Sequence, residues 1–417
     1  MPVSNRRTRL RATLLATLAT PALLTAQRTW TVDGNGTGNF TAIQPAVQAA
    51  SPGDRILVLP GAYPAFQTSK GLDIEAPVRA TVAGVTVVNL GAGEQVQLSG
   101  FDVSGVAVSA PVFVIADCQG AVLVTRCSVG VAWFNPPGPV ARIERSVRVS
   151  LHHCQLWGIA GTPVTSPGEG LSINQSSVAL RDCFIDGGRG VDAGLQWGPQ
   201  AGAHAVTVAS SNLLVAECTL TGGAGGSGYG GLTCRNGAPG GAAVLVSGSS
   251  HCLFRHASSL SGGAGGPALA PCAQGSQGDA ASDASLASLM TLDCRVNGAL
   301  AGVTRIADLT GLDAPSEVSR GNLLVVSLPG PAGTLVQVIV GHQTDYLTVP
   351  GLVTPLLLGP WLVAIGVASI GSAGPGQLSL PVPADPALRD ASLLFQGIAI
   401  PPTGPLTLTD ASDVRIR

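Results

Sequence analysis

The sequence predicts an all-β protein whose coils stack into a parallel β-solenoid. The first observation is a repeat centred on a cysteine, with clear copies at Ser176–Gly188 and Ser210–Gly223 and shorter relatives around Cys127, Cys154 and Cys294. Successive cysteines up to position 218 are 27, 29 and 35 residues apart. Periods of about 20 to 50 residues are typical of stacked repeats. One such unit cannot bury its apolar face alone, so neighbouring copies must stack.

The second observation is the alternation of apolar residues within each copy. Around Cys183, Val178 and Leu180 precede it and Ile185 follows it at the spacing of a strand with one buried face. A blurred copy at Ser249–Gly263 carries Ala257 in the cysteine position. The residue before that position is polar in every copy: Arg126, His153, Asp182, Glu217, His256 and Asp293. We therefore predict a corner there, after which the cysteine points inward.

The third observation is the composition. Of 417 residues, 45% are hydrophobic, 11% are charged, 4% are aromatic and 56 are glycine, and the net charge is −2. The length allows two domains, and the hydrophobic content excludes disorder for most of the chain. No basic stripe exists outside the N-terminus, so a nucleic-acid partner is not expected. The glycine-rich segments absorb the variable repeat length and are predicted to be loops on one side of the solenoid.

Residues 1–26 are predicted to be a secretory signal peptide. Basic residues between Arg6 and Arg11 precede an apolar run from Ala12 to Thr25, and Ala26 is small. The run is short and contains Pro21, which favours cleavage over a retained anchor. We expect a secreted, extracellular or cell-surface protein with no integral membrane segment after cleavage. Disulfides are permitted in that setting.

The segment after the signal peptide predicts a helix followed by strands. Thr41 and Gln44 have capping-box spacing, with Pro45 in the first turn of a helix that ends near Ala50. A turn at 51–54 then leads into a strand that begins at Arg55.

This segment resembles the opening of secreted right-handed β-helix proteins of the pectin-lyase-like class. The matching pattern is Asp33-x-x-Gly36-x-Gly38-x-Phe40-Thr41-x-Ile43-Gln44-x-Ala46-Val47, then Pro52-Gly53-Asp54-x-Ile56-x-Val58-x-Pro60-Gly61-x-Tyr63 and Lys70-Gly71-Leu72-x-Ile74. The resemblance implies a right-handed parallel β-helix whose open end is capped by the helix, which protects exposed strand edges. It also implies an extracellular, carbohydrate-related setting. It does not imply catalysis, because many members of the class are non-catalytic.

Further strands follow, and the pattern changes near Val303. Strands of the first part are expected at 85–90, 95–98, 112–115, 121–124 and 147–151. Beyond Val303, cysteines and paired glycines stop, and apolar strands are expected at 322–328, 334–340, 378–382, 392–399 and 406–409. The apolar run Leu352–Ile370 alternates large and small residues after Gly359–Pro360, which indicates a strand. We predict a right-handed parallel β-helix over residues 27–302 and a C-terminal antiparallel β-sandwich over residues 303–417.

Seven of the nine cysteines have one of two predicted roles. Those of the repeat lie in one inward column, where they either pack as small buried thiols or bridge neighbouring coils. Parallel side chains of a column leave the Cβ atoms too far apart, which favours buried thiols. Cys234 and Cys272 lie instead in glycine-rich segments of successive coils, and we predict a disulfide between them.

Two groups of residues have the chemistry of a cation site. The corner residues His153, Asp182, Glu217 and His256 offer imidazoles and carboxylates on neighbouring coils, which could bind a divalent metal. The alternative is a solvated edge of alternating charge. The segment Asp33–Asn39 has oxygen-bearing side chains at every second position, as in a Ca²⁺ loop. The alternative there is a turn before the capping helix, and no other cofactor is expected.

Carbohydrate contacts are predicted on the coil loops. Arg189, Asp192 and Trp197 share one loop and could touch a sugar, while Trp133 and Trp157 could offer stacking faces. The alternative is that they pack the loops. No Asp-Asp pair, Gly-His-Gly or Arg-Ile-Lys of the polygalacturonase type is present, so no catalytic residue is assigned.

The function best supported by these patterns is that of a secreted or cell-surface β-helix protein, non-catalytic and structural or polysaccharide-binding. One alternative is a polysaccharide lyase or glycoside hydrolase that acts on an extracellular polysaccharide. A second alternative is an adhesive cell-envelope protein anchored through its C-terminal domain. The sequence leaves the identity of the ligand, the role of the C-terminal domain and the oligomeric state open.

Overall fold

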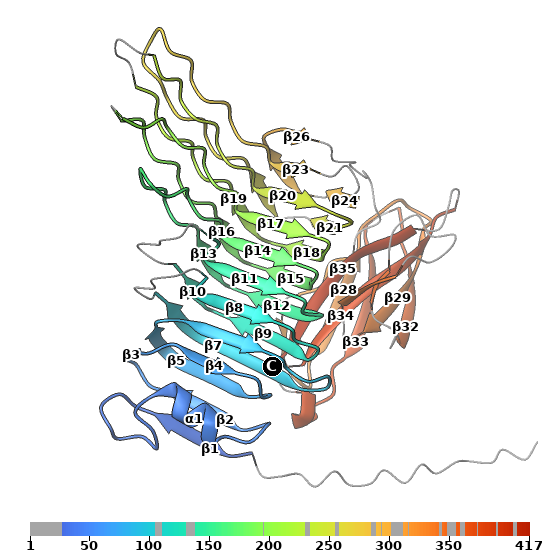
Figure 1. The fold of residues 1–417 in the computed structure, drawn as a ribbon. Helices are drawn as coiled ribbons and strands as arrows, with labels where there is room; N and C mark the ends of the chain where they lie inside the picture. Colours follow the sequence, from blue (N-terminus) through green and yellow to red (C-terminus); the bar gives the residue numbers. More distant parts are fainter. Residues whose placement is uncertain are drawn as a thin grey trace, which may run out of the picture.

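A computed structural model of the chain confirms an all-β protein dominated by a parallel β-helix (Figure 1). The structure describes residues 27–104, 111–130, 138–194, 196–229, 234–254, 258–284, 289–292, 294–301, 312–315, 317–341, 344–347, 356–358, 363–372, 374–388, 391–402 and 407–417. The predicted signal peptide lies outside these ranges. Within them, no helix is long and apolar enough to cross a membrane.

Each regular coil of the solenoid contributes three strands to three parallel ladders. In one coil, for example, β11 pairs with β8 and β14, β12 with β9 and β15, and β13 with β10 and β16. Their inward residues form one continuous core of small aliphatic side chains. The elements of the solenoid are β1 (Thr29–Val32), α1 (Ile43–Ala49), β2 (Arg55–Val58), β3 (Ala62–Tyr63), β4 (Phe66–Thr68), β5 (Asp73–Val82), β6 (Val85–Val88), β7 (Gln95–Val103), β8 (Phe113–Ala116), β9 (Ala121–Thr125), β10 (Ser128–Val129), β11 (Ala141–Glu144), β12 (Arg148–His152), β13 (Gln155–Trp157), β14 (Leu171–Asn174), β15 (Ser177–Arg181), β16 (Phe184–Asp186), β17 (Val206–Ala209), β18 (Asn212–Ala216), β19 (Thr219–Thr221), β20 (Val244–Ser247), β21 (His251–Phe254), β22 (Ser259–Ser261), β23 (Ala281–Asp283), β24 (Leu289–Leu292), β25 (Arg295–Asn297) and β26 (Leu300–Ala301).

The predicted corner is confirmed at the four copies whose corner residue the structure describes, while His256 and Asp293 lie outside the described residues. Arg126, His153, Asp182 and Glu217 have φ angles of 54°, 52°, 47° and 57°. This left-handed region is uncommon for residues other than glycine, and one residue in it turns the strand sharply. The cysteine that follows each corner is then buried and points into the core, as in Cys154 and Cys218.

In the blurred copy at Ser249–Gly263, the predicted alignment to the other copies is wrong by one residue. Because Ser259 on β22 pairs with Thr219 on β19, Ser258 rather than Ala257 takes the place of the cysteine. The backbone N–H of Cys218 accordingly donates to the Ser258 hydroxyl at 3.3 Å. A hydroxyl and a thiol of similar size can thus occupy the same inward column.

A serine column follows the other corner of the coil. The N–H of Ser146 donates to the Ser176 hydroxyl, that of Ser176 to the Ser211 hydroxyl and that of Ser211 to the Ser250 hydroxyl, at 3.1, 3.0 and 3.2 Å. Each hydroxyl also donates to a carbonyl two or three residues earlier. The buried polar groups are therefore satisfied from one coil to the next.

Helix α1 covers the N-terminal end of the solenoid, but the predicted capping box is wrong. Its N-cap residue is Ala42, without a side-chain cap. The Gln44 side chain instead bonds both backbone groups of Gln67 beside β4, at 2.7 and 3.2 Å. At the other end, the Lys70 ammonium donates to the carbonyls of residues 47, 48 and 50 at 2.8–3.0 Å. These carbonyls have no partner within the helix, and Lys70 supplies one.

The C-terminal unit is built from mostly antiparallel strands around a core of its own. Strands β28 and β33 pair antiparallel, and their inward residues share this core with a five-stranded sheet in the order β27-β35-β34-β29-β32. The elements are β27 (Glu317–Val318), β28 (Leu323–Leu328), β29 (Leu335–Gly341), β30 (Thr344–Leu347), β31 (Leu356–Leu358), β32 (Val363–Ser369), β33 (Gly376–Pro381), η1 (Pro386–Leu388), β34 (Ser392–Ile400) and β35 (Thr407–Ile416).

This unit packs against one flank of the solenoid (Figure 1). Ala179 and Leu214 project outward from β15 and β18 and lie in one small cluster with Ile339 and Leu394 of the C-terminal unit. The Arg181 guanidinium also donates to the carbonyl of Ala314 at 3.4 Å. An outward apolar row on the solenoid is thereby covered.

The glycine-rich segments project from one side as predicted, but they form an ordered arm (Figure 1). We define the glycine arm as the described residues of 187–203, 222–241 and 262–278. The N–H groups of Gly187, Gly190 and Ala193 donate at 2.8 Å to the carbonyls of residues 221, 224 and 227 in the next coil. The same step of three recurs from residues 222, 225 and 228 to residues 261, 264 and 267. Three residues per turn is the period of a polyproline-II helix.

Candidate functional site

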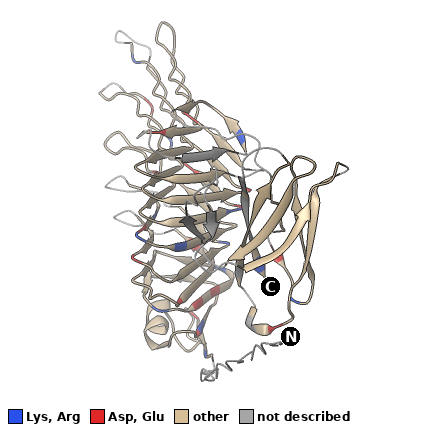
Figure 2. Ribbon diagram, turned by 90° about the vertical axis from the view of Figure 1, so that its right-hand side faces the viewer, with Lys and Arg blue, Asp and Glu red and all other residues tan. Residues whose placement is uncertain are grey.

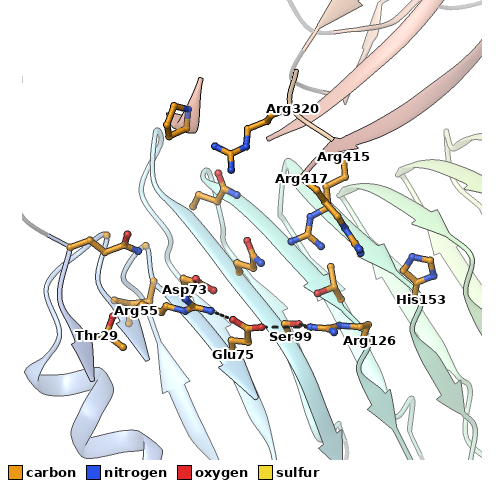
Figure 3. A pocket seen from close by; sticks show the side chains of 18 residues that line it. Thr29, Arg55, Asp73, Glu75, Ser99, Arg126, His153, Arg320, Arg415 and Arg417 are labelled. Atoms are coloured by element: carbon orange, nitrogen blue, oxygen red, sulfur yellow. Dashed lines mark hydrogen bonds and ion pairs between the residues drawn. The ribbon is translucent and has the colours of Figure 1, made fainter. Parts of the chain in front are cut away.

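A polar cleft of about 1010 Å³ lies between the N-terminal coils and the C-terminal unit (Figure 3). Its floor is the outward face of β2, β5, β7 and β9, where polar side chains alternate with buried ones. The opposite wall comes from the last strand of the chain and the turn after β27. We call this site the interdomain cleft.

The floor of the interdomain cleft is a network of charges. Arg55 on β2 forms ion pairs with Glu75 and, at 3.5 Å, with Asp73, both on β5. Arg126 lies 3.7 Å from the other oxygen of Glu75 and donates to the Ser99 hydroxyl at 2.8 Å. Both carboxylates of the floor are therefore paired with arginine.

The opposite wall adds arginines without adding carboxylates. Arg320, Arg415 and Arg417 face the floor across the cleft (Figure 3). Arg417 also pairs with Glu317, which lies outside the lining. The described lining residues include five arginines and two carboxylates, and when Glu317 is counted as the partner of Arg417, two positive charges remain in excess. Other charged residues are scattered over the coils of the solenoid (Figure 2), among them Arg145, which pairs with Asp117 and Glu144.

The sequence reasoning missed these arginines. Residues 55, 126, 320, 415 and 417 have no common spacing, and docking of the C-terminal unit brings them together. The one available signal was the composition of the basic residues, since Lys70 is the only lysine of the chain. Arginine is preferred where carboxylates or phosphates are bound through paired hydrogen bonds.

Of the four residues in the predicted metal column, the structure brings only His153 and Asp182 together. The His153 Nδ1 atom lies 2.6 Å from an Asp182 oxygen, so this pair does form. Glu217 is instead paired with Arg181 at 3.2 Å, and His256 lies outside the described residues. Among the residues that the structure describes, no cluster of three His, Cys, Asp or Glu side chains has the arrangement of a metal site.

The predicted Ca²⁺ loop forms a turn before helix α1. The Asp33 carboxylate accepts the N–H of Asn35 at 2.9 Å and the hydroxyl of Thr37. These hydrogen bonds lower the pKa of Asp33, because they favour its charged form. The carboxylate thus accepts hydrogen bonds from residues of its own loop.

The predicted carbohydrate contacts on the glycine arm do lie together. Arg189 donates to Asp192 at 3.0 Å, and the Trp197 indole donates to the Asp192 carbonyl at 3.1 Å. Asp192 also accepts the N–H of Ser227 from the next coil, at 2.7 Å. Trp157 lies on β13 with its side chain exposed, and Trp133 lies outside the described residues.

The cysteines take the two predicted roles. Cys234 and Cys272 form the predicted disulfide and link two excursions of the glycine arm. Cys127, Cys154, Cys183 and Cys218 are free and buried. Burial raises the pKa of the Cys127 thiol to about 11, so it stays protonated at neutral pH and packs as a small apolar side chain.

A smaller cavity of about 350 Å³ on the returning side of the glycine arm holds two titratable groups. Burial raises the pKa of Glu169, although the Thr207 hydroxyl donates to it at 2.7 Å. Burial lowers the pKa of His204, whose Nδ1 accepts the N–H of Ala242 at 3.0 Å. Both groups therefore favour their neutral forms.

Comparisons with known proteins add little to this description. No protein-family model and no curated protein matches the chain. Similar solved structures include the full-length tailspike protein 2 of an Escherichia coli O157:H7 bacteriophage, with 10% identity, 91% of this chain and 66% of that chain covered, and a TM-score of 0.31. The enzymatically active domain of bacteriophage CBA120 tailspike protein 2 has 10% identity, 89% and 73% coverage, and a TM-score of 0.30. A superoxide reductase from Ignicoccus hospitalis has 14% identity, 26% and 82% coverage, and a TM-score of 0.19. Scores this low carry no argument about function.

Proposed function

We propose that this is an exported β-helix protein that binds an acidic polysaccharide in the interdomain cleft. The observation that carries the proposal is the concentration of five arginines on both walls, with two positive charges in excess after the carboxylates Asp73, Glu75 and Glu317 are counted. A guanidinium presents a fixed fork of donors that fits a carboxylate or a sulfate ester. Uronic acid and sulfated residues carry these groups along a chain.

The uncharged part of the cleft suits the rest of such a ligand. Gln95 and Gln97 project from β7, and Thr29 projects from β1. Their amides and hydroxyl both donate and accept hydrogen bonds, as sugar hydroxyls do. Parallel pairing places Thr29 beside Arg55, Arg55 beside Asp73, and Asp73 beside Gln97. An extended chain along the solenoid axis therefore meets charged and uncharged groups about every 4.8 Å.

The geometry favours binding over bond cleavage. Glycoside hydrolysis needs one carboxyl group that donates a proton and a second that attacks or activates water. Asp73 and Glu75 are the two carboxylates of the lining, and both are paired with Arg55. One guanidinium thus holds both carboxylates on the same side of the cleft, so they do not flank a glycosidic bond as this chemistry requires.

The proposal is tested by calorimetric titration with oligogalacturonate and a sulfated oligosaccharide, and with a neutral dextran as a control ligand. We expect Arg126→Gln and Arg320→Gln, one from each wall, to weaken binding of the acidic ligands about 10-fold each, since a hydrogen bond to a charged group contributes about 1.5–3 kcal/mol. Arg295→Gln, on β25 outside the lining, is the matched control and should bind normally. Unchanged binding in both cleft variants contradicts the proposal. New reducing or unsaturated chain ends would instead identify the cleft as an active site.

A further inference from the structure

A second concave surface lies where the glycine arm leaves the solenoid. It has a volume of about 660 Å³, and it is lined by strand residues on one side and by arm residues such as Gly222, Gly223, Gly262 and Gly263 on the other. Among the described residues that line it, Asp186 is the only charged one. We call it the junction groove. It lies on another ladder of the solenoid than the interdomain cleft.

The floor of the junction groove is a column of side chains in exact register. Parallel pairing places Asp186 of β16 beside Thr221 of β19, Thr221 beside Ser261 of β22, and Ser261 beside Asn297 of β25. These positions follow a buried residue in each strand, so they face outward. The column therefore presents one polar side chain about every 4.8 Å along the solenoid axis.

Some hydrogen-bond donors and acceptors of this column are not used within the part of the protein that the structure describes. Asn297 donates to the Ser261 hydroxyl at 3.2 Å, which leaves the amide oxygen of Asn297 and a second amide proton. The Asp186 Oδ1 atom is buried and has no hydrogen-bond partner among the described residues. The Thr221 hydroxyl interacts with the same carboxylate. Asp186 is only partly buried, so its exposed part can still accept a hydrogen bond from a ligand.

An exposed tryptophan lies one coil before this column, outside the lining of the junction groove. Trp157 of β13 pairs with Asp186 and so occupies the same position one coil earlier. Its ring packs against Gly130, where an added Cβ would lie 3.2 Å from a ring carbon. The side chain is nevertheless 39% exposed. An exposed indole can cover the C–H face of a sugar ring, and the hydroxyls of that sugar are then directed to the sides.

The wall of the groove is mostly glycine backbone, and Ala224, Ala264 and Gln277 contribute its side chains. A Cβ added to Gly222 would lie 2.0 Å from the carbonyl oxygen of Gly241, and one added to Gly263 would lie 2.0 Å from that of Gly223. Glycine is thus required where the arm segments pack backbone to backbone. The wall is held by hydrogen bonds between coils and can be approached closely by a ligand.

We infer that the junction groove is a second binding site, for a neutral polysaccharide whose chain runs along the solenoid axis. Trp157 stacks on one sugar ring, and Thr221, Ser261 and Asn297 exchange hydrogen bonds with hydroxyls of the following rings. Asp186 accepts a hydrogen bond from a sugar hydroxyl between them. An acidic chain is disfavoured, because the lining offers no cation to pair with its charges. The inference does not depend on the interdomain cleft.

The test is retention on immobilised neutral polysaccharides, namely linear β-glucans, α-glucans, mannans and galactans, followed by titration with oligosaccharides of the retained type. We expect retention on at least one of them, and a loss of affinity of about 10-fold or more in Trp157→Ala and Thr221→Val. Thr221→Ser keeps the hydroxyl and should bind nearly as the unmodified protein does. Phe184→Ala is the matched control. It removes another exposed aromatic ring, from a position on β16 two residues before Asp186.

The outcomes separate this inference from the proposed function. Arg126→Gln should leave retention on the neutral polysaccharide unchanged, and Trp157→Ala should leave binding of the acidic ligand unchanged. Thermal unfolding of each variant shows that the fold is intact. The inference is overturned if none of the four polysaccharide types retains the protein, or if Trp157→Ala and Thr221→Val bind as well as Phe184→Ala does.

Discussion

The packing of the glycine arm leads to a sharp prediction for Gly241→Ala. A Cβ at position 241 would lie 2.0 Å from the carbonyl oxygen of Ala203 and 2.4 Å from its carbon. Both atoms are backbone, so no side chain can rotate away. The φ angle of Gly241 is not in the left-handed region, and alanine is therefore compatible with its own backbone. The whole effect of the substitution must come from the neighbouring segment.

The size of the effect follows from the contacts of Gly241. The two segments must separate by about 1.4 Å to bring the 2.0 Å contact to the 3.4 Å of ordinary packing. The hydrogen bonds from Gly241 to Gly223 and from Gly263 to Gly241, both 2.8 Å long, would then break, at about 1 kcal/mol each. Overpacking adds about 1–3 kcal/mol, and the reduced entropy of the unfolded chain offsets about 0.4–1 kcal/mol. We expect a net loss of about 2–4 kcal/mol in the local stability of the arm.

Hydrogen exchange measures this loss directly, because it reports the free energy of local opening. Amides of the arm should exchange about 30- to 1000-fold faster in Gly241→Ala, as about 2–4 kcal/mol requires, while those of β12 and β15 should be unaffected. Gly198→Ala is the matched control in the same arm, since an added Cβ there meets only the end of the Arg235 side chain, at 3.9 Å. If both variants exchange alike, the segments are loops without close packing and the reasoning fails.

Three further predictions follow from single contacts. Lys70→Met removes the donor to three helix carbonyls and should lower the free energy of unfolding in urea by about 2 kcal/mol; an unchanged midpoint would show that water replaces the ammonium. Replacing Cys234 and Cys272 together by serine opens a loop with a sequence separation of 38 residues, so the arm should lose up to about 4 kcal/mol and be cleaved faster by protease, while equal cleavage would contradict this. Because the pKa of Glu169 is raised in the folded protein, its stabilising contribution is full below the unfolded pKa and is lost as pH rises through the folded pKa. The melting temperature of the unmodified protein should therefore fall relative to Glu169→Gln from about pH 4 to about pH 7, and parallel profiles would exclude this effect.

The predicted and observed structures agree best within a single repeat. The polar residue before each cysteine predicted a corner, and the left-handed φ angles at His153 and Asp182 confirm it. The disulfide between Cys234 and Cys272 was also predictable, since the two cysteines recur at similar places in successive coils. These features depend on alternation and spacing along the chain, which local sterics translate directly into geometry.

Predictions failed where a local motif had a competing tertiary partner. Gln44 has the spacing of a capping box, yet its side chain bonds the backbone of Gln67 and ties β4 to the helix. Glu217 has the position of a metal ligand, yet Arg181 is close enough to pair with it. In both cases the partner lies 20 to 40 residues away, and its proximity depends on how the coils stack.

The sequence by itself determined the repeat, the inward and outward faces of its strands, the corners and the cysteine columns. The reason is that side chains alternate between the two faces of a strand every two residues, and a single left-handed residue makes each corner. Both effects act over short distances along the chain. Only the tertiary structure decided the interdomain cleft and the junction groove. The first requires Arg126 and Arg417 to meet through docking of the C-terminal unit, and the second requires Asp186, Thr221 and Ser261 to stack in register beside the glycine arm. Register and docking depend on contacts between residues far apart in the chain, which no local period encodes.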